Sequence, residues 1–245
     1  MYPELPTIPV CISWQMAKNF FLIVSGEEWD GEGYEDFTLD DHLAWVLEQE
    51  YDYIGKHLYN NSGYCVLASI IEAVSGESFA DFYQKNFWDA LGMRNTYCFD
   101  PSENENRSET YGASKKKGRN KFKPVSSPSI IHGDGNIFTT LSDMAIWDNV
   151  MRNNELISKS SWEWMCTPGR NSEGYGGGFY IDEESDANII FHTGAWCGVQ
   201  NCYMRYLDDD ISILTLGNFE GFDDESIIGE IYDIVADEEE EEEDY

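Results

Sequence analysis

Two short stretches carry polar side chains that could take part in chemistry. In YNNSGY, the phenol of Tyr59 and the amide of Asn61 stand two residues apart, directly before an apolar helical run. Because an amide both donates and accepts hydrogen bonds, Asn61 could hold a second amide, or could accept from N–H groups at a helix entry. In HTG, His192 and Thr193 precede Gly194 at the end of a strand-like run. The same three residues could also be an ordinary strand end with no role in chemistry.

The composition excludes several classes of partner. Of 245 residues, 42% are hydrophobic and 15% aromatic, which is enough for a sizeable core. The 47 acidic and 15 basic residues give a net charge of −32, which argues against nucleic acid and anionic membranes as partners. The basic run at 115–123 is interpreted as a solvated loop rather than a phosphate or partner site.

The cysteines and the N-terminal region give no sign of a metal site or a membrane anchor. The six cysteines show no C-x-x-C pair and no spacing with histidine that is typical of zinc. We interpret them as reduced thiols and do not favour a disulfide between Cys197 and Cys202. No signal peptide is recognisable, and KNFFLIVSG is too short to span a bilayer, so we expect a soluble, cytoplasmic protein.

Local signals predict a helical block from Thr38 onward. Thr38 and Asp41 open a first helix, whose apolar face holds Leu39, Leu43, Val46 and Leu47. A second helix runs from about 62 to 74 and stops at Gly76, and we expect it to be central because it is apolar on most sides. Two further helices are expected, one opened by Ser78 with Asp81 and ending at Leu91–Gly92, and one opened by Thr140 with Asp143.

The last third of the chain predicts antiparallel strands within 175–181, 187–194, 198–206 and 211–218. Isoleucines at helical spacing between 227 and 235 then predict one amphipathic helix over the sheet. The fold class is therefore α+β, with the helices segregated from the sheet. The expected domains are a poorly interpretable segment at 1–37, one domain at 38–236 and a disordered acidic tail at 237–245. Within that domain, 38–165 is mainly helical with a polar loop near 100–129, and 175–236 holds the sheet and its helix.

Several motifs occur in one order along the chain: YNN, GYCVLASIIEAVSG, LGMRNT, GDGNIFTTLSDMAIW and HTG. Together they resemble the serine β-lactamase and penicillin-binding-protein superfamily, in particular its class C β-lactamases, D-alanyl-D-alanine carboxypeptidases and related esterases. The resemblance runs from about Phe37 to Val235. It implies a β-lactamase/transpeptidase-like fold and a cleft for a small-molecule or peptide substrate, and it implies no metal or organic cofactor.

The resemblance also implies roles for the residues at the helix entry. In that family a Ser hydroxyl attacks an amide or ester carbonyl, and a nearby group must take its proton. Tyr59 would lie beside the Ser and help to manage this proton through a cationic partner. Asn61 would contact the substrate amide and the catalytic Lys. His57 and His132 match no motif and are interpreted as loop residues, while Asp134 and Asp143 are interpreted as a turn and a cap.

The strand motif would contribute the other wall of the cleft. By resemblance, the cation of His192 and the hydroxyl of Thr193 would hold a substrate carboxylate, and Gly194 would leave room for the substrate backbone. The N–H of Ala195 would be one donor of the oxyanion hole.

One element of the family pattern is not found in this sequence. The nucleophile belongs to an S-x-x-K motif that precedes Y-x-N, but the single S-x-x-K here is Ser114–Lys117, in the polar loop, and is interpreted as a chance match. Pro3–Glu4 and FFLIVSG are faintly similar to segments that follow the nucleophile, so Ser25 would be structural. We therefore expect the first helix, the first strands and the nucleophile helix to be missing, leaving an unpaired sheet edge.

Three hypotheses on function follow. The first is a truncated or degenerate member of the superfamily that performs no acyl transfer. The second is a working serine hydrolase whose nucleophile is unrecognised or encoded upstream. The third is a non-catalytic module that binds a peptide in the cleft, or that completes its sheet with a partner strand or by self-association.

Overall fold

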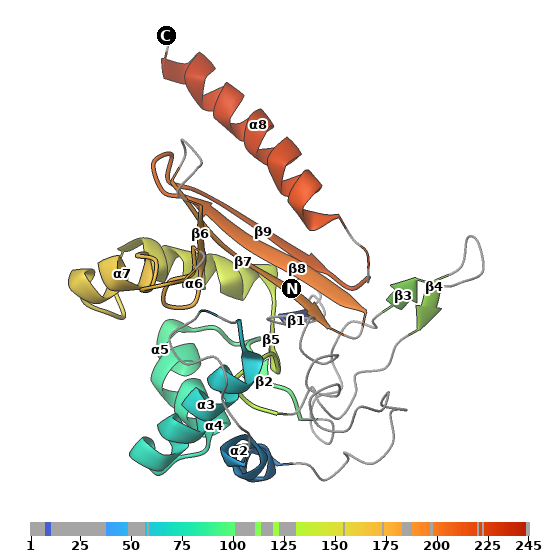
Figure 1. Cartoon of the computed structure of the whole chain (residues 1–245). Coiled ribbons are helices and arrows are strands. Elements are labelled where there is room, and N and C mark those ends of the chain that lie inside the picture. The colour runs from blue at the N-terminus through green and yellow to red at the C-terminus, as the bar shows by residue number, and fades with distance from the viewer. Residues whose placement is uncertain are drawn as a thin grey trace.

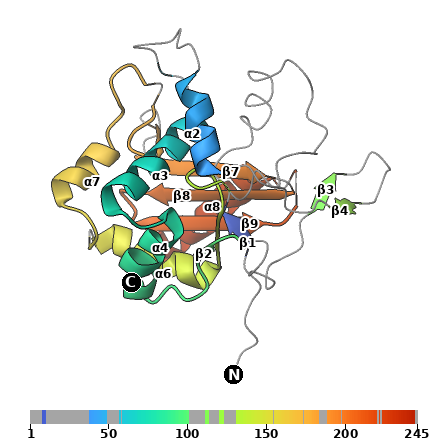
Figure 2. The same cartoon turned by 90° about the horizontal axis from the view of Figure 1, so that it is seen from below.

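A helical region and an antiparallel sheet make up the protein. The computed structural model describes residues 8–10, 38–48, 57, 59–100, 111–113, 120–122, 131–153, 155–172, 174–182, 188–196, 198–219, 221 and 223–243. Helix α8 lies over one face of the main sheet, and the other helices lie on the opposite side (Figure 1). The same arrangement seen from below places α3 and α4 in front of the sheet (Figure 2). The α+β prediction is confirmed.

Helix α2 (Leu39–Leu47) begins with the predicted capping pair. The backbone N–H of Thr38 donates to Asp41 Oδ2 over 2.9 Å, and the N–H of Asp41 donates to Thr38 Oγ1 over 3.2 Å. These reciprocal bonds satisfy two N–H groups that the first turn leaves unpaired. Of the predicted apolar face, Val46 is buried, whereas Leu47 is exposed.

Helix α3 (Asn61–Ser75) lies within one residue of its predicted bounds. The Asn60 side chain caps it by accepting from the N–H of Gly63 over 2.9 Å, and Gly76 ends it at φ +72°. The expectation that α3 is central is wrong. Three apolar side chains face outward, namely Leu67, Ile70 and Val74, with exposed fractions of 52%, 50% and 83%. The helix buries only the face of Asn61, Cys65 and Ala68, and its neighbours in the helical region are α2 and α4.

The next predicted helix forms as three consecutive pieces. Ser78 caps α4 (Phe79–Tyr83), which continues through the π-helical turn η1 (Gln84–Trp88) into α5 (Asp89–Leu91). The exit at Gly92 is as predicted, since this residue takes the left-handed conformation at φ +78°. Trp88, the last residue of the π-helical turn, is buried, with an exposed fraction of 3%.

Two smaller sheets accompany the main sheet, one with the order β1-β5-β2 and one formed by β3 and β4. Strand β5 (Ile137–Thr139) pairs on its two sides with β1 (Ile8–Val10) and β2 (Tyr97–Cys98). Residues 8–10 are thus a strand, although the first 37 residues gave no interpretable pattern. The predicted polar loop contains a hairpin of β3 (Tyr111–Ala113) and β4 (Asn120–Phe122). Helices α6 (Leu141–Asn153) and α7 (Lys159–Met165) follow.

The main sheet has the predicted antiparallel order β6-β7-β8-β9. Its strands are β6 (Tyr180–Asp182), β7 (Ile189–Trp196), β8 (Val199–Tyr206) and β9 (Ile211–Gly217). His192 pairs with Tyr203, and Thr193 pairs with Cys202. Because side chains alternate between faces, Cys202 joins the core under α8, whereas Asn201 and Tyr203 face the helical region.

Helix α8 (Asp224–Glu243) covers the outer face of the sheet as predicted. Ile228 is fully buried, and the Tyr232 ring stacks on Tyr206 with centroids 3.7 Å apart. The structure continues this helix over residues 237–243, where a disordered tail was expected. Glutamate is a good helix former, and an already nucleated helix extends at little cost. No helix in the described ranges is both long and apolar enough to cross a membrane.

Candidate active site

The two sequence motifs meet across the interface between the helices and the sheet. Tyr59 precedes α3, and His192 is the fourth residue of β7. The Tyr59 hydroxyl lies 3.4 Å from His192 Nε2, although 133 positions separate the residues. The phenol and the imidazole proposed from sequence therefore share one site.

The hydrogen bonds of His192 indicate its tautomer. Its Nδ1 lies 2.7 Å from the carbonyl oxygen of Thr193, which can only accept, so Nδ1 carries the proton. In a neutral ring Nε2 is then an acceptor, and the Tyr175 hydroxyl donates to it over 3.1 Å. The Tyr64 hydroxyl, 2.9 Å from that of Tyr175, donates in turn. A directed chain of hydrogen bonds thus runs from α3 through Tyr175 to the ring.

Burial favours the uncharged forms of His192 and Tyr175. Removal from water lowers the pKa of His192, and the bond to the Thr193 carbonyl opposes this only in part. Burial also raises the pKa of Tyr175. The site therefore presents a neutral imidazole near pH 7, whereas the resemblance implied a cation at this position.

Aromatic rings surround the imidazole on several sides. Tyr180 lies with its centroid 4.8 Å from that of Tyr175 and 5.6 Å from that of His192. His57 stacks on Tyr175 at 5.8 Å, so it belongs to the site and is more than a loop residue. Sequence reasoning gave no role to Tyr175 or Tyr180. The signal that could have found Tyr175 is its place directly before three glycines, which allow close packing.

The remaining predicted residues lie next to these. Asn61 is buried in the first turn of α3, two residues after Tyr59. Gly194 and Ala195 follow His192 in β7, where they pair with Asn201 and Gln200 of β8. The roles proposed for these residues stay predictions.

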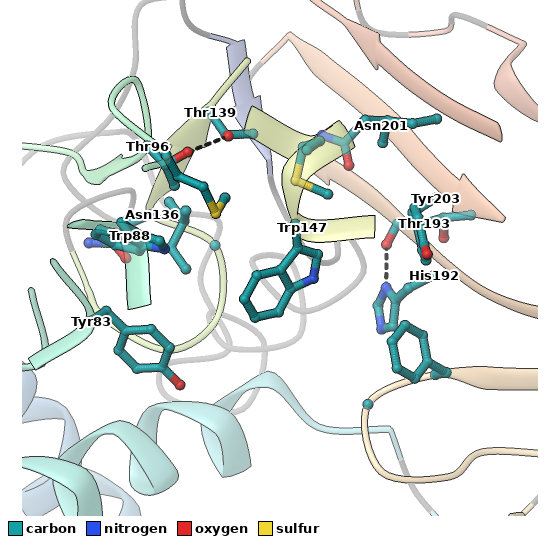
Figure 3. Close-up of a pocket in the computed structure, with 18 residues that line it drawn as sticks. Tyr83, Trp88, Thr96, Asn136, Thr139, Trp147, His192, Thr193, Asn201 and Tyr203 are labelled. Carbon is teal, nitrogen blue, oxygen red and sulfur yellow. Dashed lines mark hydrogen bonds between the residues drawn. The ribbon is translucent and has the colours of Figure 1, made fainter. Parts of the chain in front are cut away.

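A cavity of about 280 Å³ opens beside the imidazole, between the sheet and the helical region. Figure 3 shows Trp147 between two groups of labelled side chains, with Trp88 and Asn136 on one side and His192 and Tyr203 on the other. The lining is mainly apolar. It consists of Tyr83, Trp88, Met93, Thr96, Gly133, Gly135, Asn136, Ile137, Thr139, Met144, Trp147, Gly178, Phe179, His192, Thr193, Asn201, Tyr203 and Leu214.

The loop that carries Asn136 is seated tightly on α3. Gly133 has φ +111°, and a Cβ there would lie 2.5 Å from the carbonyl oxygen of Tyr64. Burial raises the pKa of the next residue, Asp134, to about 7, and its hydrogen bond with Cys65 opposes the rise in part. These contacts fit the interpretation of Asp134 as a turn residue packed against the helix.

Asp143 was interpreted as a cap, and its carboxylate also bonds outside its own helix. Its Oδ2 accepts from the N–H of Asn95 over 2.7 Å and from the hydroxyl of Thr96 over 2.8 Å. The Thr96 hydroxyl lies 2.7 Å from that of Thr139 in β5. This buried network ties α6 to the wall of the cavity.

Two further candidates cannot be placed. Ser25 and the Ser114–Lys117 match lie outside the described residues. Within the described residues, no cluster of three or more His, Cys, Asp or Glu side chains could hold a metal ion. The four cysteines that the structure describes, Cys65, Cys98, Cys166 and Cys202, are free thiols.

Comparison with known proteins bears on this geometry. Penicillin-binding protein 4* of Bacillus subtilis is 29% identical over 181 residues, which are 66% of this chain and 40% of that protein. D-aminopeptidase of Brucella canis is 24% identical over 172 residues, or 68% of this chain and 33% of that protein. The chain thus spans less than half the length of the curated relatives it matches.

Solved structures share the fold. The octameric penicillin-binding protein homologue from Pyrococcus abyssi superposes with a TM-score of 0.69 at 24% identity, covering 87% of this chain and 50% of that chain. A D-stereospecific amidohydrolase from Streptomyces gives 0.66 at 20% identity, covering 85% and 64% respectively. The family profile described as Beta-lactamase matches residues 27–235. With its motifs brought together in a fold of this kind, the chain belongs to the beta-lactamase family.

Proposed function

We propose that this chain forms the substrate-binding part of a β-lactamase-type serine hydrolase site, and that it makes no acyl-enzyme by itself. The observation that carries the proposal is the contact between Tyr59 and His192 beside a cavity. In such a site, Tyr59 would face the reacting carbonyl from the helical side. The N–H of Ala195 would donate to the carbonyl oxygen from the sheet.

Our proposal that the chain makes no acyl-enzyme rests on its sequence. Its one S-x-x-K match lies in a basic polar stretch after Tyr59, with no apolar face that could bury a helix. The nucleophile in this family also supplies one N–H of the oxyanion hole. Losing one such donor typically costs about 2.7 to 4 kcal/mol of transition-state stabilisation. Without the hydroxyl and that donor, the remaining groups would bind a carbonyl compound without cleaving it.

The names of the relatives suggest the class of substrate. They include a penicillin-binding protein, a D-aminopeptidase and a D-stereospecific amidohydrolase. A compound with an amide or ester carbonyl next to a D-residue is therefore the ligand that we propose for this cleft.

The proposal separates into two measurements. Purified protein is incubated with nitrocefin, a p-nitrophenyl ester and a fluorescent penicillin, and we expect neither turnover nor a mass increase. Calorimetry with an acyl-D-alanyl-D-alanine peptide should detect reversible binding, weakened in Tyr59→Phe. Tyr232→Phe is the matched control, because its hydroxyl bonds to Asp209 on the side of α8. One stoichiometric covalent adduct would refute the lack of acylation, and equal affinity of all three proteins would refute the site.

A second candidate is an active hydrolase whose Ser and Lys are encoded upstream. One observation favours this candidate. Tyr59 and His192, the side chains predicted to lie beside the nucleophile, contact each other. An in-frame S-x-x-K in the DNA directly 5′ of the Met1 codon would support this candidate, and its lack there would count against it.

A further inference from the structure

The cavity beside His192 contains a polar side chain that the fold leaves unpaired. Asn136 is 1% exposed and lines the cavity. Both its Nδ2 and its Oδ1 are without a hydrogen-bond partner in the described structure. Buried amides are almost always paired, so this side chain calls for a partner outside the described contacts.

Other polar groups of the lining have partners of their own. The Tyr203 hydroxyl donates to Asp148 over 2.7 Å. The hydroxyls of Thr96 and Thr139 bond to each other. The rest of the wall is largely apolar, with Trp88, Met93, Met144, Trp147, Phe179 and Leu214. A ligand that fits this cavity must therefore be apolar over most of its surface and polar where it meets Asn136.

The hydrogen-bonding groups of the Asn136 carboxamide determine which group of a ligand can pair with it. Its Oδ1 needs a donor and its Nδ2 needs an acceptor, both at the same point of the wall. A primary amide, or the N–H and C=O of one extended peptide residue, supplies the two on the same side, whereas an ester supplies only the acceptor. The cavity volume of about 280 Å³ suits one large side chain with its adjoining amide.

We propose that this cavity binds an apolar side chain with an adjoining amide, and that Asn136 recognises the amide through one donated and one accepted hydrogen bond. His192 and Thr193 line the same cavity. The inference therefore rests on the proposed function and concerns the same site. Two sources share this chemistry. One is a small free amide, and the other is an apolar residue within a peptide.

The test compares a primary amide with the methyl ester of the same acid. Calorimetry measures the affinity of 3-phenylpropanamide and of methyl 3-phenylpropanoate, which lacks the N–H. We expect the unmodified protein to bind the amide roughly tenfold tighter, since the ester leaves Asn136 Oδ1 unpaired. Asn136→Leu removes the pairing at similar volume and should abolish this preference. Asn153→Leu, at an exposed position at the end of α6, should retain it.

The comparison on the unmodified protein needs no variant, so it stands even if Asn136→Leu fails to fold. Equal affinity for both probes, or no binding of either probe or peptide at millimolar concentration, overturns the inference. An end-blocked Ala-Ala-Phe-Ala-Ala peptide distinguishes the sources. Binding of the peptide alone indicates a polypeptide ligand, and binding of the free amide indicates a small one.

Failure of this inference is distinguishable from failure of the proposed function. Amide binding through Asn136 in a protein that shows no effect of Tyr59→Phe supports the inference and contradicts the proposed site. Binding of the D-alanyl peptide through Tyr59, with equal affinity for the two probes, gives the opposite result.

Discussion

The hydrogen-bond chain at His192 predicts the effect of removing one hydroxyl. Tyr175→Phe keeps the ring that packs on Tyr180 but removes the donor to Nε2 of His192. A neutral hydrogen bond contributes about 0.5 to 1.5 kcal/mol, and this one stabilises only the uncharged imidazole. Its loss should raise the pKa of His192, because the imidazole should then bind a proton roughly 2- to 10-fold more tightly. We expect the lower half of this range, because Tyr59 still lies 3.4 Å from Nε2.

The assay is an NMR titration of the imidazole Cε1–H signals in the unmodified protein, Tyr175→Phe and Tyr232→Phe. His192→Gln assigns the signal by its disappearance. The Tyr232 hydroxyl bonds to Asp209, away from the site, so this control should leave the titration unchanged. An unchanged or lowered pKa of His192 in Tyr175→Phe would refute the reasoning, because Nε2 would then not be the acceptor.

The same shift has a consequence for stability. Since the folded protein lowers the pKa of His192 below its ordinary value of 6.5, the unfolded chain takes up the proton first as pH falls. This group therefore destabilises the fold below about pH 6.5 and has no such effect well above it. The difference in unfolding free energy between about pH 8 and pH 5 that His192 contributes should be smaller in Tyr175→Phe. Urea unfolding of both proteins, each compared with its His192→Gln form, measures this contribution.

Three further predictions concern stability. Asp143→Ala removes the acceptor of Asn95 N–H and the Thr96 hydroxyl, which at about 1.5 to 3 kcal/mol each should cost about 3 to 6 kcal/mol in urea unfolding. Asp143→Asn keeps an acceptor and should cost less, and equal costs would contradict this account. Gly133→Ala places a Cβ 2.5 Å from a backbone oxygen at φ +111° and should cost at least about 2 kcal/mol, so a neutral result would argue against the tight seat of the loop. Added salt should raise the melting temperature, because it screens the repulsion of a chain with net charge −32, and a flat or falling trend would contradict this.

Local signals predicted most of the helices and the last three strands of the main sheet. They did not predict α7 or the small strands, and the strand expected within 175–181 begins only at Tyr180. The bounds of α3 follow from Asn60 and Gly76, whose side chain and backbone conformation act within a few residues. The strands of the main sheet follow from short apolar runs between turn residues. Motif order also predicted that Tyr59 and His192 would share a site, which spacing alone could not have done.

The parts that sequence could not give depend on tertiary contacts. Leu67, Ile70 and Val74 are apolar, so their pattern predicted a central helix, and only the folded structure shows them exposed. The lowered pKa of His192 comes from its burial, and its partner Tyr175 comes from outside β7, so neither could be seen in the HTG motif. The unpaired amide of Asn136 is likewise visible only once its surroundings are known.

The imidazole is held from two unequal directions. Tyr175, which comes shortly before β6, bonds to it over 3.1 Å, whereas Tyr59 reaches from the helical side at 3.4 Å, near the upper limit for a hydrogen bond. An opening of the interface by a fraction of an ångström would therefore release the phenol of Tyr59 first. The imidazole would keep its orientation through its hydrogen bonds to the Thr193 carbonyl and Tyr175. A ligand could therefore enter the site by displacing only the helical side.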